Sequence, residues 1–305
     1  MGRKIAFVTG ASRGIGKACA IELAKVGYDI AVTARTVQEG EGREHSSTLR
    51  ESDTSPLPGS LSTVADAVRA VGRDALVVPA DILDRASLGA AAATVLERWG
   101  TVDVVVHNAR YIGPGHMDRF AETPIELLEK MMDANVFAPL VLNKLFLPGM
   151  IEAGHGTFIN ISSAAAYGDP TKPAGEGGWG MGYGMTKAAF HRIAGFLNVE
   201  YEGTGIRAFN VQPGLIATER IGQDMAKFGI ANVGAPPEVV GLVAAWLCTD
   251  PEAENRNGDT IEAQYFAHER GMLPGWEGPL PGQGAIAYDR SGAALHDLEL
   301  ALEAP

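Results

Sequence analysis

The sequence predicts an α/β fold, in which a single parallel sheet of seven strands is covered by helices on both faces. Short runs of β-branched and other apolar residues recur along the 305-residue chain. Most of these runs are continuous rather than alternating, as expected for strands that are buried on both faces. Helix-like stretches separate them, and this alternation is typical of a doubly wound sheet with right-handed crossovers.

The individual elements follow from the same pattern. Strands are predicted over residues 4–9, 29–34, 75–80, 103–107, 157–161, 206–211 and 259–263. Helices are predicted near residues 15–26, 61–71, 86–99, 125–152, 183–202 and 237–248. No repeat or linker divides them, so we expect one domain over residues 1–265 with insertions at about 36–60 and 168–182. Residues 266–305 are expected to pack on that domain or on a neighbouring subunit.

The composition excludes several classes of protein. The chain carries 37 acidic and 25 basic residues, a net charge of −12, and such a surface disfavours nucleic acid or an anionic membrane as a partner. No signal-peptide pattern opens the chain, and no apolar run approaches the ~20 residues that span a bilayer. Cys19 and Cys248 are expected to be small buried side chains rather than a disulfide. We therefore expect a soluble cytoplasmic protein.

A glycine-rich turn joins the first predicted strand to the first predicted helix. Gly10, Gly14 and Gly16 allow the backbone to turn tightly and to approach a pyrophosphate closely. The helix that follows offers free N–H groups and the positive end of its dipole. The intervening residues, Ser12, Arg13 and Ile15, are expected to share in this site. The position between strand and helix favours a dinucleotide site over a merely structural turn.

The end of the second predicted strand indicates which dinucleotide binds. A carboxylate there would hydrogen-bond the ribose hydroxyls of NAD. This sequence instead has Ala34 followed by Arg35, and Arg13 lies in the glycine turn. Two guanidinium groups suit a 2′-phosphate, which they bind in a bidentate manner. We expect NADP(H) to be preferred over NAD(H); the alternative is that Arg35 points to solvent.

A tyrosine and a lysine lie four positions apart at the start of a predicted helix. This spacing places Tyr183 and Lys187 on one helix face, where the ammonium favours the phenolate form of the tyrosine. Ser163 follows the fifth predicted strand. Ligands bind at the carboxyl ends of the strands in an open parallel sheet, so the nucleotide turn and these three side chains are expected to meet there.

In their order along residues 3–263, these motifs resemble those of the short-chain dehydrogenase/reductase family, whose members have a Rossmann-like domain. The resemblance implies that Asp81 meets the adenine, and that Ile82, Asn108 and Ala109 form part of the cofactor site. It further implies that a stretch after the sixth strand frames the nicotinamide carboxamide. The residues of that stretch are Pro213, Gly214, Ile216 and Thr218.

The resemblance also implies a catalytic tetrad of Asn135, Ser163, Tyr183 and Lys187. In the family, the tyrosine exchanges a proton with the reacting oxygen and the serine hydrogen-bonds that oxygen. The lysine holds the nicotinamide ribose, and the asparagine supports a water that resupplies protons. Pro139 lies four residues after Asn135 and cannot donate to its carbonyl. That carbonyl is therefore expected to accept a water, unless the proline only kinks the helix for packing.

The departures from the family pattern concern the substrate. The insertion at 168–182 is expected to border the pocket, with Tyr167, Trp179 and Met181 as apolar walls. Arg110 replaces the usual glycine after Asn108-Ala109, where it meets a substrate carboxylate or, as we expect, a surface acid. In the insertion at 36–60, Arg43 and Arg50 either fold over the cofactor phosphate or lie on a mobile loop, which is the state we expect.

No metal site is predicted, because the histidines lack ligand spacing, and packing or surface roles are expected for them. These histidines are His107, His116 and His191.

The sequence thus predicts an NADP(H)-dependent oxidoreductase that transfers hydride between nicotinamide and a carbonyl or secondary alcohol (CH–OH donors), with Tyr183 as general acid/base. One alternative is a reductase of 3-oxoacyl thioesters, which the acidic net charge disfavours. Another is a non-catalytic NADP(H)-sensing regulatory protein, which the intact tetrad disfavours. The substrate is expected to be a small molecule, and the resemblance implies a homodimer or homotetramer.

Overall fold

The computed structural model describes residues 2–228 and 233–280, and it contains one sheet of seven parallel strands. The strands are β1 (Lys4–Thr9), β2 (Tyr28–Ala34), β3 (Ala75–Pro79), β4 (Val104–His107), β5 (Gly156–Ile161), β6 (Ile206–Gln212) and β7 (Thr260–Glu262). Their order across the sheet is β3-β2-β1-β4-β5-β6-β7. The predicted fold class is confirmed.

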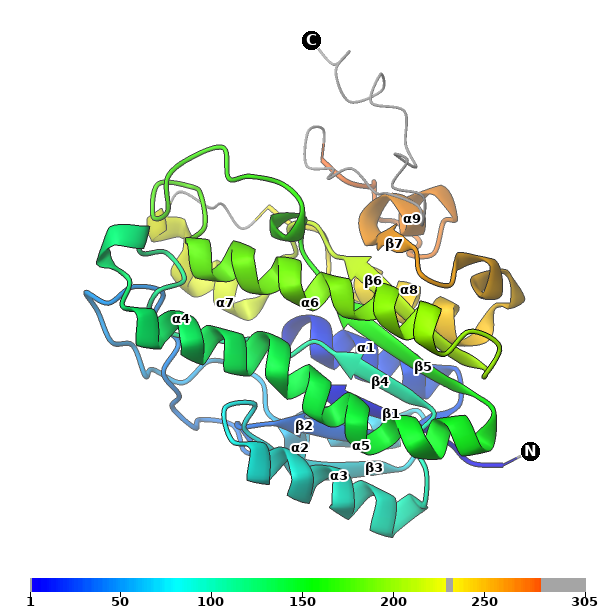
Figure 1. Cartoon of the computed structure of the whole chain (residues 1–305). Helices are drawn as coiled ribbons and strands as arrows, with labels where there is room; N and C mark the ends of the chain where they lie inside the picture. Colours follow the sequence, from blue (N-terminus) through cyan, green and yellow to red (C-terminus); the bar gives the residue numbers. More distant parts are fainter. Residues whose placement is uncertain (1, 229–232, 281–305) are drawn as a thin grey trace.

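Helices cover both faces of this sheet (Figure 1). They are α1 (Gly14–Lys25), α2 (Leu61–Ala70), α3 (Arg85–Trp99), α4 (Ile125–Met132), α5 (Ala138–Ala153), α6 (Met181–Glu200), α7 (Glu219–Asp224), α8 (Glu238–Thr249) and α9 (Ala263–Glu269). One buried core joins the sheet to α1, α2 and α8, and a second joins it to α3, α5 and α6. The strands are buried on both faces because they lie between these two cores, which explains their continuous apolar sequence.

The strand order reverses between β1 and β4. The chain runs outward from β1 through β2 to β3, and it then returns to place β4 on the other side of β1. The loops that leave β1 and β4 therefore diverge, and they open a crevice at the carboxyl ends of the strands. The predicted nucleotide turn leaves β1 at this point, so the topology places it where a ligand is expected to bind.

The long helix predicted over residues 125–152 is interrupted by a π-helical turn, Asp133–Phe137. Pro139 has no N–H to donate to Asn135, and the N–H of Ala138 instead donates to the carbonyl of Asp133, five residues back. The proline thus changes the winding of the helix without ending it. Insertions of this kind are frequent at functional sites, and this one contains Asn135.

By length and mean hydropathy (1.4), the helical stretch Ile125–Ala153 could cross a membrane. This corrects our expectation that no apolar run is long enough. Half of its most apolar window is buried inside the fold, where α5 packs in the second core. The segment is accounted for as a core helix of the α/β domain.

The residues beyond 265 are only partly described. Phe266 and Ala267 of α9 join the first core, and Leu273 and Trp276 pack against it. Residues up to 280 therefore pack on the domain, while the predicted extension over 281–305 lies outside the described residues. Cys19 and Cys248 are both free and buried, as predicted.

We predict that Gly241→Ala weakens the packing that fixes α1, and with it the nucleotide turn. A Cβ at Gly241 of α8 would lie 2.7 Å from the carbonyl oxygen of Ala18 in α1, so the helices must separate. We expect the free energy of unfolding to fall by about 1–3 kcal/mol in urea denaturation. Gly89→Ala in α3 is the control, because a Cβ there meets nothing within 4 Å; it should stabilise by about 0.5–1 kcal/mol. Equal effects of the two substitutions would contradict this account.

Candidate active site

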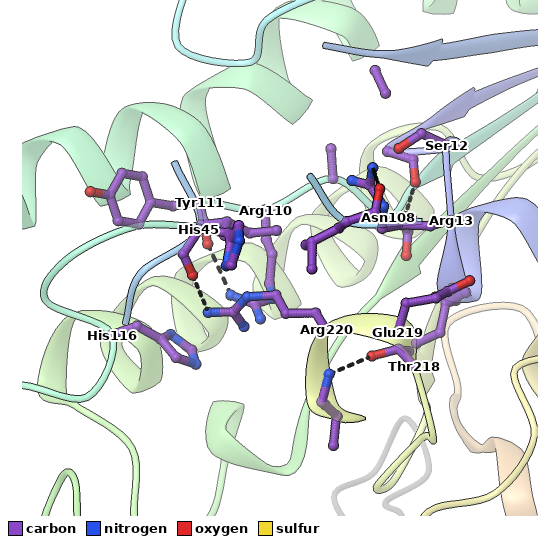
Figure 2. A pocket seen from close by; sticks show the side chains of 18 of the residues that line it. Ser12, Arg13, His45, Asn108, Arg110, Tyr111, His116, Thr218, Glu219 and Arg220 are labelled. Atoms are coloured by element: carbon purple, nitrogen blue, oxygen red, sulfur yellow. Dashed lines mark hydrogen bonds between the residues drawn. The ribbon is translucent and has the colours of Figure 1, made fainter. Parts of the chain in front are cut away.

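A cavity of about 560 Å³ lies at the carboxyl ends of the strands (Figure 2). Its lining includes the last residues of several strands and the residues that follow six of them, so segments far apart in the sequence meet in one place. These segments are residues 9–10 and 12–15 after β1, 33–36 after β2, 80–83 after β3, 108–112 after β4, 163–164 after β5 and 212–216 after β6.

The glycine turn after β1 is shaped to receive an anionic ligand. Gly10 and Gly14 have φ values of +64° and +52°, which side chains rarely adopt. A Cβ at Gly16 would collide with the carbonyl oxygen of Gly10. Helix α1 then begins with no side-chain cap at Arg13 and no acidic residue in its first turn. Its first N–H groups remain available to a pyrophosphate, so the described residues fit a dinucleotide.

The two predicted phosphate ligands differ in their surroundings. Arg13 lines the cavity, but its Nε donates to Pro58 O (2.9 Å) and its Nη2 to Gly59 O (2.8 Å), so it also ties down the insertion. Arg35 lines the cavity too, and no described hydrogen bond or ion pair engages its guanidinium group. Burial lowers the pKa of Arg13, and the positive charge of Arg35 acts in the same direction. The two cations therefore lie close together.

The insertion at 36–60 forms one wall of the cavity and lies beside α4 and α7 in Figure 1. Arg43 lines the cavity and donates to the carbonyl of Arg35 (3.1 Å). Ser47 accepts from Met117 N (2.9 Å) and, at its hydroxyl, from Arg220 Nη2 (2.7 Å). These bonds attach the segment to the domain, in place of the loose loop that we expected. Arg50 does not line the cavity and pairs with Glu122 (3.2 Å).

Three of the four predicted catalytic residues lie at the cavity or directly beside it, and Asn135 lies apart from it. Ser163 and Tyr183 line the cavity. Lys187 is buried one helical turn beyond Tyr183 and donates to the carbonyl of Ile161 (2.7 Å). Burial lowers the pKa of Lys187 to about 7, and the charge of Arg110 adds to the effect.

Asn135 is buried and does not line the cavity, but its side chain links two parts of the site. Its Oδ1 accepts from the backbone N–H of Tyr111 (2.5 Å). Its Nδ2 donates to the hydroxyl of Thr186 (2.9 Å), which precedes Lys187 in α6. The π-helical turn thus holds the loop after β4 against the helix that carries Tyr183.

Two further side chains flank Tyr183. The guanidinium carbon of Arg110 lies 5.5 Å from the centroid of the tyrosine ring. The ring of His116 lies edge-on at 4.6 Å between centroids. We expected a surface acid beside Arg110 and a packing or surface role for His116, yet both line the cavity and no described acid pairs with Arg110. The departure from glycine at position 110, next to the cofactor motif, was the available signal.

The remaining predicted cofactor residues also lie at the cavity. Asp81 and Ile82 line it after β3, where Asp81 Oδ1 accepts from Leu83 N (3.0 Å). The other predicted lining residues are Asn108, Ala109, Pro213, Gly214, Ile216 and Thr218, and all are present. Gln264, which sequence reasoning missed, holds the loop after β6 by donating to Pro213 O and Leu215 O (3.0 Å each).

Of the three predicted substrate walls, the structure places one at the cavity and two away from it. Trp179 lines the cavity. Met181, the first residue of α6, is 52% exposed and lies outside the lining. Tyr167 turns toward β7, where its hydroxyl donates to Glu262 Oε1 (2.7 Å). Burial raises the pKa of this carboxyl to about 8. The apolar lining includes Ile112, Met117 and Leu215 instead.

Within residues 2–228 and 233–280, no cluster of three or more His, Cys, Asp or Glu side chains could hold a metal ion. His107 is buried and hydrogen-bonds Asn143 Oδ1 (2.6 Å). His191 bridges the hydroxyls of Ser162 (2.8 Å) and Thr260 (3.2 Å). Both histidines therefore have packing roles, as expected.

Comparison with known proteins agrees with this geometry. The family model for short chain dehydrogenase matches residues 4–227. The chain is 31% identical to 2-(R)-hydroxypropyl-CoM dehydrogenase of Xanthobacter autotrophicus, over 87% of this chain and 99% of that protein. It is 27% identical to cyclohexanol dehydrogenase of Rhodococcus sp., over 79% of this chain and 87% of that protein.

Solved structures with this fold hold either nicotinamide dinucleotide. Carveol dehydrogenase from Mycobacterium avium in complex with NAD has a TM-score of 0.69 at 20% identity, covering 86% of this chain and 96% of that one. A metagenomic short-chain oxidoreductase in complex with NADP has a TM-score of 0.62 at 26% identity, covering 83% of this chain and 93% of that one. The family model matches most of the chain, and the chain therefore belongs to the short-chain dehydrogenase/reductase family of oxidoreductases.

Proposed function

We propose that the protein is an NADP(H)-dependent oxidoreductase that interconverts a carbonyl compound and its secondary alcohol. One observation carries the proposal: Ser163 and Tyr183 line the same cavity as the glycine turn, and Lys187 is buried one helical turn beyond Tyr183. A proton donor and a hydrogen-bond donor thus share a chamber with a site that fits a dinucleotide. The bound cofactor supplies or accepts the hydride.

The side chains of the chain then act on the reacting oxygen. In reduction, Tyr183 gives its hydroxyl proton to that oxygen, and it takes the proton back in oxidation. Ser163 donates a hydrogen bond to the same oxygen and thereby orients the carbonyl. Lys187 is held one helical turn beyond Tyr183 by a hydrogen bond to the carbonyl of Ile161. Asn135 positions α6 through Thr186, and it does not touch the cavity.

The preference for NADP(H) rests on the charges at the end of β2. Arg35 faces the cavity without a described partner, and Arg43 lies beside it. Arg13 contributes positive charge to the same region, although two of its nitrogens already bind the insertion. A 2′-phosphate would give Arg35 an anionic partner, whereas the ribose hydroxyls of NAD would leave its charge uncompensated.

We also propose that copies of the chain associate through α5 and α6, which run together across one face of the sheet (Figure 1). Large apolar side chains on these helices are exposed to solvent. They are Phe137, which precedes α5, together with Leu145, Ile151, Phe196 and Val199. Val199 is 71% exposed and Phe196 58%. Exposed large apolar side chains on these two helices favour a protein interface there.

We predict that Tyr183→Phe lowers kcat for ketone reduction with NADPH by about 10²- to 10⁴-fold, because the general acid is lost. The dissociation constant for NADPH, measured by quenching of protein fluorescence, should change little, since only a hydroxyl is removed. Retained turnover in this variant would exclude Tyr183 as the proton donor. Absence of turnover in the wild type across a broad ketone and aldehyde panel, despite tight NADPH binding, would favour the non-catalytic alternative.

We predict that Arg35→Ala lowers the ratio of kcat/KM for NADPH over NADH by about 10- to 100-fold, the worth of a charged hydrogen bond to phosphate. Initial rates with both cofactors measure this ratio. Arg50→Ala is the matched control, because Arg50 belongs to the same insertion but lies outside the cavity and pairs with Glu122. An unchanged ratio in Arg35→Ala would remove the basis for the NADP(H) preference.

We predict that Phe196→Glu shifts the wild-type oligomer toward monomer in light scattering, because the substitution buries a charge in the proposed interface. Phe120→Glu is the control: Phe120 is 56% exposed, close to Phe196, but it lies outside α5 and α6. A monomeric wild type, or the same oligomer in both variants, would contradict the proposed interface.

A further inference from the structure

We propose that Arg110, with Arg220 and His116 beside it, forms an anion-binding subsite next to Tyr183, and that the substrate carries a carboxylate close to its reacting carbon. This inference rests on the proposed function, and it narrows the substrate from carbonyl compounds in general to oxo acids and their hydroxy acids.

Two separate segments bring these side chains into one part of the cavity. Arg110 comes from the loop after β4, His116 from the same loop further on, and Arg220 from α7. All three line the cavity, and Figure 2 shows them near one another, away from Ser12 and Arg13 at the glycine turn. Their charges interact, because burial and the positive charges of Arg110, Arg220 and Lys187 lower the pKa of His116.

Each side chain is held in place, so the subsite is built rather than accidental. Arg110 Nη1 donates to the carbonyl of Tyr111 (2.9 Å), and its guanidinium carbon lies 5.5 Å from the Tyr183 ring centroid. Arg220 is buried, and its Nη2 donates to the hydroxyl of Ser47 (2.7 Å) and the carbonyl of His45 (3.4 Å). His116 is buried against the ring of Tyr183.

Arg110 has no described counter-ion. Its neighbours in the structure are a neutral carbonyl and an aromatic ring. Burial lowers the pKa of Arg110, which means that its surroundings oppose the positive charge. A partly buried guanidinium group is costly unless an anion compensates it. A bound carboxylate would supply that charge and would accept two parallel hydrogen bonds.

Each acidic residue that lines the cavity either has another described partner or lies away from Arg110 (Figure 2). Glu41 pairs with Arg43. Glu44 accepts from the hydroxyl of Ser52 and from the N–H of Ser46 (2.8 Å). Glu219 lies near Arg13, on the glycine-turn side, where its charge opposes the effect of burial on the arginine pKa.

Asp81, the remaining acidic residue of the lining, accepts from the N–H of Leu83 (3.0 Å) at the end of β3. No described acid is therefore placed to neutralise Arg110, and an anion from outside the chain can take that position.

The position of Arg110 limits the substrate. Its guanidinium group lies against the ring of Tyr183, whose hydroxyl serves the reacting oxygen. A carboxylate bound by Arg110 must then lie within one or two bonds of the reacting carbon. The substrate is accordingly a 2-oxo or 3-oxo acid, whose remaining chain meets the apolar wall of Trp179, Met117 and Leu215.

Matched substrate pairs test this proposal. The rates of NADPH oxidation are measured with a series of 2-oxo and 3-oxo acids and with their methyl esters, which keep the shape but lack the charge. For at least one chain length we expect kcat/KM for the acid to exceed that for its ester by about 10- to 100-fold. In Arg110→Gln this acid-to-ester ratio should fall toward 1, and Arg110→Lys should restore part of it.

Arg50→Gln is the control variant, because Arg50 pairs with Glu122 outside the cavity; its ratio should equal that of the wild type. Thermal unfolding of each variant excludes loss of the fold as the cause. If ketones and esters turn over with NADPH but no acid is preferred, the anion subsite is wrong while the proposed function stands.

If no compound turns over, the proposed function is wrong. A binding measurement then still tests the anion subsite. Calorimetric titration of the NADP⁺-loaded protein with the same acids and esters requires no reaction. Tighter binding of an acid than of its ester, lost in Arg110→Gln, supports the subsite independently of catalysis. Equal binding of acid and ester, or the same preference in Arg110→Gln, overturns it.

Discussion

A hydrogen-bonded junction between the ends of β1 and β4 holds the site together. The hydroxyl of Thr9 accepts from the backbone N–H groups of Asn108 and Ala109 (3.0 Å each). The side-chain amide of Asn108 donates two hydrogen bonds in the opposite direction, to Thr9 O (3.0 Å) and Gly10 O (3.1 Å). These bonds span the point where the strand order reverses, so they fix the glycine turn against the loop that carries Arg110.

The same junction continues to the catalytic helix. Tyr111, two residues after Ala109, donates its backbone N–H to Asn135, which in turn donates to Thr186 of α6. A single chain of hydrogen bonds thus connects the turn that receives the cofactor to the helix that carries Tyr183 and Lys187. The π-helical turn that Pro139 imposes places Asn135 in this chain. The π-helical turn in this core helix therefore helps to position the reacting groups.

The charge of the whole molecule and the charge of its site have opposite signs. The chain has a net charge of −12, yet Arg110, Arg220 and Lys187 gather beside one tyrosine. Burial and the charge of Arg110 lower the pKa of Lys187, and burial and all three positive charges lower the pKa of His116. The net charge indicates which classes of partner the surface disfavours. The charged side chains beside Tyr183 determine which ligand the cavity binds.

The strands, and the site residues at their carboxyl ends, could be predicted from the sequence because they follow the regular pattern of a parallel sheet. Residues 4–9 form β1 as expected, because a strand buried on both faces needs continuous apolar residues. The glycine turn, Ser163 and Tyr183 follow from the same logic, since strand ends in an open sheet converge. The π-helical form of the turn at Asp133–Phe137 was not predicted, because the apolar period continues through it and Pro139 indicates only that the hydrogen bond to the carbonyl of Asn135 is lost.

Loops were predicted less well, because tertiary contacts rather than periodicity decide their course. Met181 faces outward and Tyr167 turns to Glu262, although both were expected to line the pocket. Arg13 was expected to serve the cofactor alone, but the insertion also uses its guanidinium group. No local sequence pattern indicates contacts with residues that are far away along the chain.

A crystal structure of the protein with NADP⁺ and an oxo acid is the most direct test, because the central claim is that one cavity holds both. The account predicts the pyrophosphate at the N-terminus of α1, the 2′-phosphate on Arg35, and the carboxylate on Arg110 with the carbonyl oxygen at Tyr183. A nicotinamide ring bound away from Tyr183, or an acid whose carboxylate faces solvent while Arg110 contacts only the protein, would contradict it.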